Sequence, residues 1–302
     1  MSAVVELART PPRADSPRSP PAAAVDAMVN ALSIDVEDYF QVSAFAPHID
    51  RDDWDRLPCR IERNVDLILA LLDDAGVAAT FFTLGWIAQR YPDLVRRIAA
   101  AGHEVASHGF AHRRATEQTP EQFLADIRLA KAVLEDIVGC EVAGYRAPSF
   151  SVGPHNAWAF DCIGRAGYRY SSSVYPIRHD HYGAPDANRF PHESVPGLLE
   201  LPIATVRVLQ ANWPAGGGGY FRLLPYRVSR WSIARINAVD QRPAMFYFHP
   251  WELDPGQPRV RGPGVKTRFR HYVNLHRTEQ RLARLVRDFR WNRADRVFLP
   301  LA

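Results

Sequence analysis

Three carboxylates crowd the end of an apolar, strand-like stretch near the start of the sequence. The run Ala-Leu-Ser-Ile-Asp-Val-Glu-Asp-Tyr-Phe at 31–40 places Asp35, Glu37 and Asp38 close together. A single Asp after a strand is commonly a turn or capping residue, but neighbouring carboxylates repel one another unless a cation or an arginine compensates them. The pattern therefore favours a cation site over a simple turn.

A second apolar run, Glu-Val-Ala-Ser at 104–107, leads into His108 and His112. Histidines four residues apart on a helical turn can present both imidazoles to one ion, although such pairs are also common on protein surfaces. Two imidazoles and one carboxylate would leave coordination positions open for water and substrate, as a catalytic metal site requires. Together, the two strand ends predict a metal-dependent hydrolase with its site at the C-terminal rim of a barrel.

Two further polar residues stand at the ends of strand-like runs. Arg146 lies in Gly-Tyr-Arg-Ala-Pro-Ser-Phe. Arginine is usually a solvated surface residue, but at the same rim it would pair with a carboxylate and keep that carboxylate ionised. His249, in Phe-Tyr-Phe-His-Pro-Trp-Glu, ends the most apolar strand of the second half of the chain. The residues alone are equally compatible with a structural role and with a general-acid role for this histidine.

These residues need a framework of strands and helices that brings the strand ends together. The sequence alternates between β-prone runs and amphipathic segments, which predicts strand–helix repeats and a parallel sheet, open or closed. Strands are expected at 30–36, 77–84, 104–107, 141–146 and 168–174, and helices at 60–75, 86–101, 120–138 and 154–166. The later part of the chain predicts strands at 198–209, 245–248 and 297–299, a flexible loop at 216–219 and a helix at 274–289.

Composition restricts the class of protein. The chain has 302 residues, of which 47% are hydrophobic, enough to bury a substantial core. Residues 1–27 are rich in Pro, Ala and Arg, and because this composition cannot bury much apolar surface we expect them to be disordered. They also lack the pattern of a signal peptide. No apolar run is long enough to cross a bilayer, and Cys59, Cys140 and Cys162 lack metal-binding spacing. We therefore expect a cytoplasmic protein with reduced thiols and no transmembrane segment.

Positive charge is concentrated near the C-terminus. The net charge is +4, and residues 259–296 contain eleven Arg and one Lys against Glu279, Asp288 and Asp295. An acidic glycan or a membrane surface would be a suitable partner for this segment. A solvated helix face with a basic loop explains the charge more simply, and we favour that interpretation. No aromatic interleaving or recognised module supports nucleic-acid binding.

The four motifs together resemble the NodB-type polysaccharide deacetylases, carbohydrate esterase family 4. Ser-Ile-Asp-Val-Glu-Asp, Ser-His-Gly-Phe-Ala-His, Arg-Ala-Pro-Ser-Phe and Phe-His-Pro-Trp occur in this order within residues 29–255. The Asp-Val-Glu-Asp-Tyr-Phe opening is similar to that of deacetylases from exopolysaccharide loci associated with exosortase and PEP-CTERM systems. The resemblance implies an α/β fold, an irregular (β/α)7 barrel, over residues 28–255. Residues 1–27 would then be a tail, and 256–302 a basic C-terminal extension packing on the barrel.

The resemblance also implies a role for each candidate residue. Asp35 would be the catalytic base, Arg146 the arginine that braces this base, and His249 the catalytic acid. His108 and His112 would bind a divalent metal ion, with Zn²⁺ expected.

The first motif departs from the usual family pattern, in which two Asp are adjacent and the second binds the metal. Here Val36 intervenes, so Glu37 or Asp38 must supply the carboxylate ligand. Relatives with an Asp-Val-Asp opening favour Glu37. The Asp-Trp motif that usually orients the catalytic histidine is not recognisable at 171–176, so the partner of His249 is left open.

The implied activity is metal-dependent removal of acetyl groups from N-acetylated sugars of a polysaccharide or its precursor, in exopolysaccharide biosynthesis. The partner would be an N-acetylated glycan, and a peripheral contact with a membrane-linked glycan is compatible with this function. One alternative is hydrolysis of a small cyclic imide or amide by the same fold. Another is a non-catalytic carbohydrate-binding protein, which the complete set of base, ligands and acid disfavours. The sugar, its linkage and the oligomeric state are not predicted.

Overall fold

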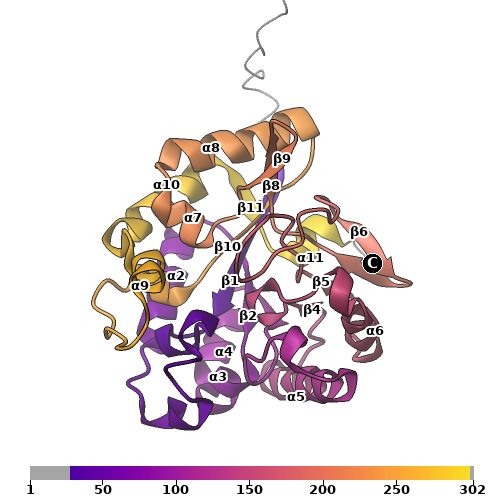
Figure 1. The fold of residues 1–302 in the computed structure, drawn as a ribbon, viewed down its shortest axis with the longest axis vertical. Coiled ribbons are helices and arrows are strands. Elements are labelled where there is room, and N and C mark those ends of the chain that lie inside the picture. Colours follow the sequence, from indigo (N-terminus) through magenta and orange to yellow (C-terminus); the bar gives the residue numbers. More distant parts are fainter. Residues whose placement is uncertain (1–27, 300–302) are drawn as a thin grey trace, which may run out of the picture.

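A computed structural model describes residues 28–299, and the predicted disordered tail, residues 1–27, lies outside them. Its centre is a nine-stranded sheet with the order β10-β1-β2-β3-β4-β5-β7-β6, in which β11 also pairs with β1 (Figure 1). All of these pairs are parallel except that of β6 with β7. The strands are β1 Val29–Val36, β2 Thr80–Thr83, β3 Glu104–Ser107, β4 Gly144–Tyr145, β5 Tyr170–Ser171, β6 His192–Val195, β7 Leu198–Glu200, β10 Met245–Phe248 and β11 Arg290–Asn292.

Helices connect successive strands and cover the outside of this sheet (Figure 1). Parallel neighbours require such crossovers, so the predicted strand–helix alternation is confirmed in its order. The helices are α2 Ile61–Asp74, α3 Gly85–Arg90, α4 Pro92–Ala100, α5 Pro120–Val138, α6 Trp158–Arg165, α7 Gly218–Leu223, α8 Tyr226–Arg235, α9 Val265–Tyr272, α10 Thr278–Asp288 and α11 Ala294–Phe298. A separate hairpin consists of β8 Thr205–Val208 and β9 Ala211–Pro214.

Irregular backbone joins the region after β7 to β10. Ala204 N donates to Met245 O at 3.1 Å, and Tyr247 N donates to Gly216 O at 2.7 Å. Ala215 N donates to Ala204 O at 3.1 Å and links the two irregular segments. The sheet therefore curls into a distorted (β/α)7 barrel, which is the predicted fold class.

Side chains alternate between the barrel interior and the helical shell along each strand, as strand geometry requires. In β1, Leu32 and Ile34 belong to the core cluster formed with the helices, whereas Ala31 belongs to the cluster that contains Phe82 of β2. Because the period is two, Asp35 lies on the same side as Ala31, inside the barrel. The interior row of β1 thus ends in a carboxylate at the C-terminal rim.

One predicted helix and one predicted loop differ from the structure. The helix expected at 86–101 is two helices that meet at Tyr91, because the following Pro92 disfavours a helical conformation for the residue before it. The prediction of a flexible loop at 216–219 is wrong. Gly217 has φ 109° and pairs with Tyr247, and a Cβ on it would lie 2.0 Å from the carbonyl oxygen of Tyr247.

The two strands predicted at 198–209 and 297–299 are also wrong. The first is interrupted and becomes β7 and β8, which belong to different sheets. The second segment belongs largely to the helix α11, because the backbone amides at the start of this helix have hydrogen-bond partners on neighbouring strands. Ala294 N donates to Thr80 Oγ1 at 2.7 Å, and Asp295 N donates to Glu104 Oε2 at 3.3 Å.

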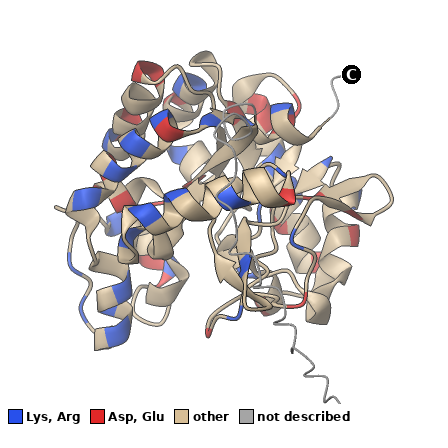
Figure 2. Ribbon diagram, turned by 90° about the horizontal axis from the view of Figure 1, so that it is seen from above, with Lys and Arg blue, Asp and Glu red and all other residues tan. Residues whose placement is uncertain are grey.

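The C-terminal segment contributes directly to the sheet, since β11 lies beside β1. Some of its arginines have structural partners: Arg281 Nη1 donates to the carbonyl oxygens of Phe221, Arg222 and Leu224 at 2.7, 2.8 and 3.1 Å. Lys and Arg are interspersed with Asp and Glu over the helices (Figure 2). Within residues 28–299, no helix combines the length and apolarity needed to span a bilayer.

Candidate active site

A cavity of about 520 Å³ lies where the parallel strands end, and we call it the main cavity. Its walls include Asp35, Glu37, His108, His112 and His249. Asp35 is the next-to-last residue of β1, and the histidines come from the segments that follow β3 and β10. The structure therefore brings five of the seven predicted site residues to the wall of one cavity.

The predicted base and its arginine form a buried ion pair. Arg146 is 0% exposed, and its Nη1 donates to Asp35 Oδ1 at 2.5 Å and to Ser33 Oγ at 2.9 Å. Its Nη2 donates to Ser172 Oγ at 2.9 Å, and its guanidinium lies 4.0 Å from the ring centroid of Phe82. The arginine is thus fixed on all sides and holds one carboxylate oxygen of Asp35, while Oδ2 lies 3.9 Å from His249 Nε2.

Three of the predicted metal ligands converge. Ligand atoms of Glu37, His108 and His112 all lie within 4.8 Å of one another, and His112 Nε2 is 2.7 Å from Glu37 Oε2. His108 Nδ1 lies 2.9 Å from Arg146 O, so that nitrogen carries the proton and Nε2 keeps its lone pair. A backbone carbonyl in this position is the usual partner of a metal-binding histidine.

The charge states of these side chains suit a cation. Burial lowers the pKa of His108 to about 4, so its imidazole is neutral at physiological pH. Burial would raise the pKa of Glu37, but the charges of His112 and His249 outweigh it and lower the pKa to about 2. Metal ligation needs neutral imidazole and ionised carboxylate. Two histidines with one carboxylate therefore fit a divalent ion such as Zn²⁺, with positions left for water and substrate.

Asp38 does not join this group. Its side chain accepts hydrogen bonds from Tyr39 N, at 2.7 Å, and from Arg60 N, and it caps the short helix Tyr39–Gln41. Of the two carboxylates that the sequence left open, the geometry favours Glu37. The backbone amides of Tyr39 and Arg60 occupy the Asp38 carboxylate, whereas the Glu37 carboxylate lies beside His108 and His112.

The histidine pair is presented differently from the expectation. His108 and His112 do not lie on a helical turn but in the loop that follows β3. His112 has φ 49°, a left-handed conformation that is uncommon for a residue with a side chain. The loop therefore directs both imidazoles toward Glu37 without a helix.

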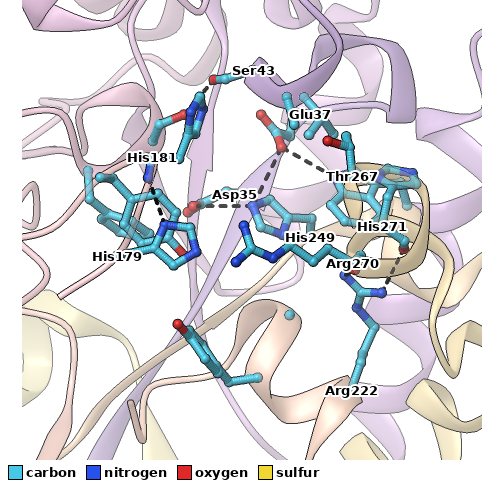
Figure 3. Close-up of a pocket in the computed structure, with 18 of the residues that line it drawn as sticks. Asp35, Glu37, Ser43, His179, His181, Arg222, His249, Thr267, Arg270 and His271 are labelled. Atoms are coloured by element: carbon cyan, nitrogen blue, oxygen red, sulfur yellow. Dashed lines mark hydrogen bonds and ion pairs between the residues drawn. The ribbon is translucent and has the colours of Figure 1, made fainter. Parts of the chain in front are cut away.

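His249 has a partner that the sequence did not identify. Its Nδ1 lies 2.7 Å from Glu252 Oε1, and Glu252 Oε2 accepts from Arg222 Nε at 2.5 Å. Its Nε2 faces the main cavity, 3.5 Å from Glu37 Oε1 (Figure 3). Burial would lower the pKa of His249, but the carboxylates of Glu37 and Glu252 raise it to about 9. The imidazole is therefore protonated near neutral pH, as a general acid must be.

Arg222 ties this partner to the C-terminal part of the chain. Burial would raise the pKa of Glu252, but the Arg222 guanidinium lowers it to about 2. The same guanidinium donates to the carbonyl oxygens of Arg270, His271 and Val273 at 3.1, 2.7 and 3.1 Å. The residues that end α9 therefore help to orient the candidate acid.

Trp251 makes a second connection of this kind. Its ring stacks on His271 with centroids 4.2 Å apart, and its Nε1 donates to Glu37 Oε1 at 3.3 Å.

Glu252 could have been found from the motif His-Pro-Trp-Glu, in which a glutamate follows the histidine by three residues. No comparable signal marks Arg222, because only the fold brings α7 next to the turn after β10.

Two family models cover most of this chain. Residues 52–171 match a family described as polysaccharide deacetylase, and residues 172–299 match a family described as a domain of unknown function (DUF3473). Asp35 and Glu37 precede the first match, and His249 falls within the second. The candidate site thus combines residues that precede the first match with residues of both matched regions.

Curated relatives are similar to short parts of the chain. A chitooligosaccharide deacetylase of Rhizobium leguminosarum is 44% identical over 61 residues, 20% of this chain and 28% of that protein. A peptidoglycan-N-acetylglucosamine deacetylase of Bacillus cereus is 33% identical over 88 residues, 29% of this chain and 30% of that protein. The chain therefore spans less than a third of either relative.

A solved structure supports the fold over a longer range. A crystal structure described as a polysaccharide deacetylase from Mycobacterium smegmatis has a TM-score of 0.53 and 20% sequence identity. The similarity covers 90% of this chain and 88% of that chain. At this identity it is evidence of a shared fold only. Residues 52–171 therefore carry a polysaccharide deacetylase domain, within a fold that is shared over 90% of the chain.

Proposed function

We propose that this protein is a metal-dependent hydrolase that removes acetyl groups from N-acetylated sugars of a polysaccharide or its precursor, in exopolysaccharide biosynthesis. The observation that carries the proposal is that Asp35 and His249 face one cavity together with Glu37, His108 and His112. Asp35 Oδ2 and His249 Nε2 are 3.9 Å apart, and both line the main cavity. A base and an acid that face the same space can serve the two proton transfers of amide hydrolysis.

The proposed reaction uses these groups in sequence. Asp35 Oδ2 accepts a proton from a water as the water oxygen bonds to the acetamide carbonyl carbon. Arg146 holds the other oxygen of Asp35 and so keeps the carboxylate in place. His249 Nε2 then donates its proton to the amide nitrogen, because an amine departs poorly without one. The carbon–nitrogen bond breaks, and the products are acetate and a sugar with a free amine.

The metal ion would be held by Glu37, His108 and His112. When bound, a divalent ion lowers the pKa of a coordinated water and polarises a carbonyl oxygen. The second role of Glu37 is electrostatic, since its carboxylate helps to keep His249 protonated. Zn²⁺ suits this donor set of two imidazoles and a carboxylate.

Mass spectrometry of an acetylated oligosaccharide panel tests the proposal. The panel contains chitooligosaccharides, peptidoglycan fragments and acidic oligosaccharides with N-acetylated sugars, each incubated with protein loaded with Zn²⁺. We expect the loss of one or more acetyl groups from at least one glycan, and no loss after treatment with a chelator. Hydrolysis of a small cyclic imide with no activity on any glycan would favour the alternative reaction of this fold.

A further inference from the structure

A smaller cavity of about 220 Å³ adjoins the main cavity, and we call it the side cavity. Val42, Ser43, Pro47, His112 and His181 line both. We propose that the side cavity binds an anionic substituent, a carboxylate or a phosphate, carried by the glycan that is deacetylated. This inference rests on the proposed function and narrows its substrate class to acidic glycans.

Three residues that line the side cavity each have a nitrogen without a hydrogen-bond partner, and these residues carry the inference. Gln41 Nε2, Arg114 Nε and His181 Nε2 are buried and have no hydrogen-bond partner within residues 28–299. A buried polar atom without a partner is costly, and native proteins contain few of them; Gln41 Nε2 and Arg114 Nε can only donate. Their concentration around one cavity points to a ligand that is rich in acceptors.

The orientation of Gln41 is fixed by its own helix cap. The residue is 2% exposed, and its Oε1 accepts from Asp38 N at 2.8 Å. Because the oxygen of the amide is used in this way, the nitrogen is the atom left without a partner. A nitrogen of this kind can only donate, so it selects an acceptor.

The charges around the side cavity select an anion among acceptors. Arg51 and Arg114 line it, and Glu117 is the one acidic residue in its described lining. Arg51 is held in place by Ala111 O and His112 O, at 2.9 and 3.1 Å from its Nε and Nη2. A guanidinium with a free N–H makes its strongest hydrogen bonds to carboxylate or phosphate oxygens.

The side cavity lies next to the residues assigned to the reaction. His112 belongs to both walls and is one of the three converging ligands. An anionic group in the side cavity would therefore belong to the sugar whose acetamide meets Asp35, or to its neighbour in the chain. This contact would set which sugar of the glycan is deacetylated.

The test compares Gln41→Glu and Arg114→Met with the wild-type protein. Glu keeps the oxygen that accepts from Asp38 N but replaces the donor with a negative charge. The matched control is Arg113→Met, because Arg113 is exposed and absent from both cavities. The substrates are an oligosaccharide of alternating N-acetylglucosamine and glucuronate, its carboxyl-reduced form and a neutral chitooligosaccharide. Glucuronate and inorganic phosphate, added as competitors, distinguish the two anion chemistries.

We expect kcat/KM to be highest for the glucuronate oligosaccharide. Gln41→Glu and Arg114→Met should each lower this value by roughly 10- to 100-fold, the usual worth of a charge-assisted hydrogen bond, with little change on the neutral substrates. Arg113→Met should change neither. Equal losses on acidic and neutral substrates, or no wild-type preference for the acidic one, would overturn the inference while deacetylation stands.

Calorimetry of the same oligosaccharides separates this inference from the proposed function. If the acidic oligosaccharide binds and Gln41→Glu abolishes binding, but no glycan loses acetyl groups, the proposed function fails and the anion site stands. Absence of binding to every anionic probe overturns the anion site. Thermal melting of each variant checks that the protein is folded.

Discussion

His249 Nδ1 and Glu252 Oε1 lie 2.7 Å apart, and Glu252 also pairs with the buried Arg222. Glu252→Gln keeps the shape of the side chain and removes its charge, so the pKa of His249 should fall from about 9. A general acid works only below its pKa. The alkaline limb of kcat should therefore move to lower pH, and kcat on an amide substrate should fall by roughly 10- to 100-fold. A pH–rate profile measures both effects.

The control for this variant is Glu279→Gln, since Glu279 is exposed and does not line the main cavity. An activated acetyl ester provides a second comparison, because its leaving group needs little protonation and should show a smaller loss. An alkaline limb that stays in place in Glu252→Gln would show that Glu252 does not act through the pKa of His249.

Substitutions at the candidate ligands should show whether Glu37 or Asp38 binds the metal ion. His108→Ala, His112→Ala and Glu37→Gln should each lower the bound metal sharply, because each removes one of three converging ligands. Asp38→Asn should retain the metal and lower thermal stability instead, since Asp38 accepts from two backbone amides. Elemental analysis and thermal melting of the same samples give both readouts. Full metal content in both histidine variants would contradict the ligand assignment.

Asp35→Asn tests the base. Asn keeps an oxygen for Arg146 but cannot take a proton, so turnover should fall by about 10²–10⁴-fold. Stability should also fall, because Arg146 is 0% exposed and would lose its compensating charge. Kinetics and denaturant unfolding measure the two effects separately. Turnover within a few fold of the wild type in a folded, metal-loaded variant would exclude Asp35 as the base.

Glu104 gives a prediction for stability at the opposite end of β3. Burial, together with the nearby Asp295 charge, raises the pKa of Glu104 to about 7, above its ordinary value of 4.5. Between these pH values the unfolded chain has lost a proton that the folded protein keeps, so the stability contributed by Glu104 falls as pH rises from about 4.5 to about 7. Glu104→Gln removes this titration and should be relatively more stable than the wild type at pH 8 than at pH 4.5.

Gln can satisfy the three partners of Glu104, because its oxygen can accept from Thr80 Oγ1 and Asp295 N, at 2.6 and 3.3 Å, and its nitrogen can donate to Tyr170 OH, at 2.8 Å. Denaturant unfolding of both proteins across this pH range tests the prediction, with the exposed Glu62→Gln as the control. A stability difference that does not vary with pH would show that Glu104 has the same pKa in the folded and unfolded chain.

Gly217→Ala should be strongly destabilising. Its new Cβ would lie 2.0 Å from Tyr247 O at a φ of 109°, so backbone next to the strand that carries His249 must move. We expect a loss of more than about 2 kcal/mol of unfolding free energy. Gly264→Ala is the matched control, because nothing lies within 4 Å of its Cβ position. Similar unfolding midpoints for the two variants would restore the flexible-loop interpretation.

The strand ends were predictable because local sequence determines them. Asp35, His108, Arg146 and His249 each follow directly after an extended run, and parallel strands place such residues at one rim whatever the details of the barrel. The preference for Glu37 over Asp38 comes from the resemblance to relatives with an Asp-Val-Asp opening, because both residues lie beyond the end of β1 at Val36.

The remaining features depend on tertiary contacts. Arg222 and Glu252 are thirty residues apart in the chain, and only the packing of α7 joins them. The strand predicted at 297–299 carries β-prone residues, but the hydrogen bonds from Ala294 and Asp295 to side chains of β2 and β3 select a helix there. Local preference is weak enough to be overridden by such contacts.

The Arg222 guanidinium has a consequence for how this protein can be divided. All groups assigned to the chemistry lie before residue 255, yet the guanidinium that holds Glu252 is itself held by carbonyl oxygens at 270, 271 and 273. A fragment that stops after the last catalytic motif would contain every reactive side chain and lack the support of its acid. The border between the two family matches at residues 171 and 172 is likewise crossed by Arg146, which bonds Ser172. Neither half is a module that can be recombined or transplanted with a working site.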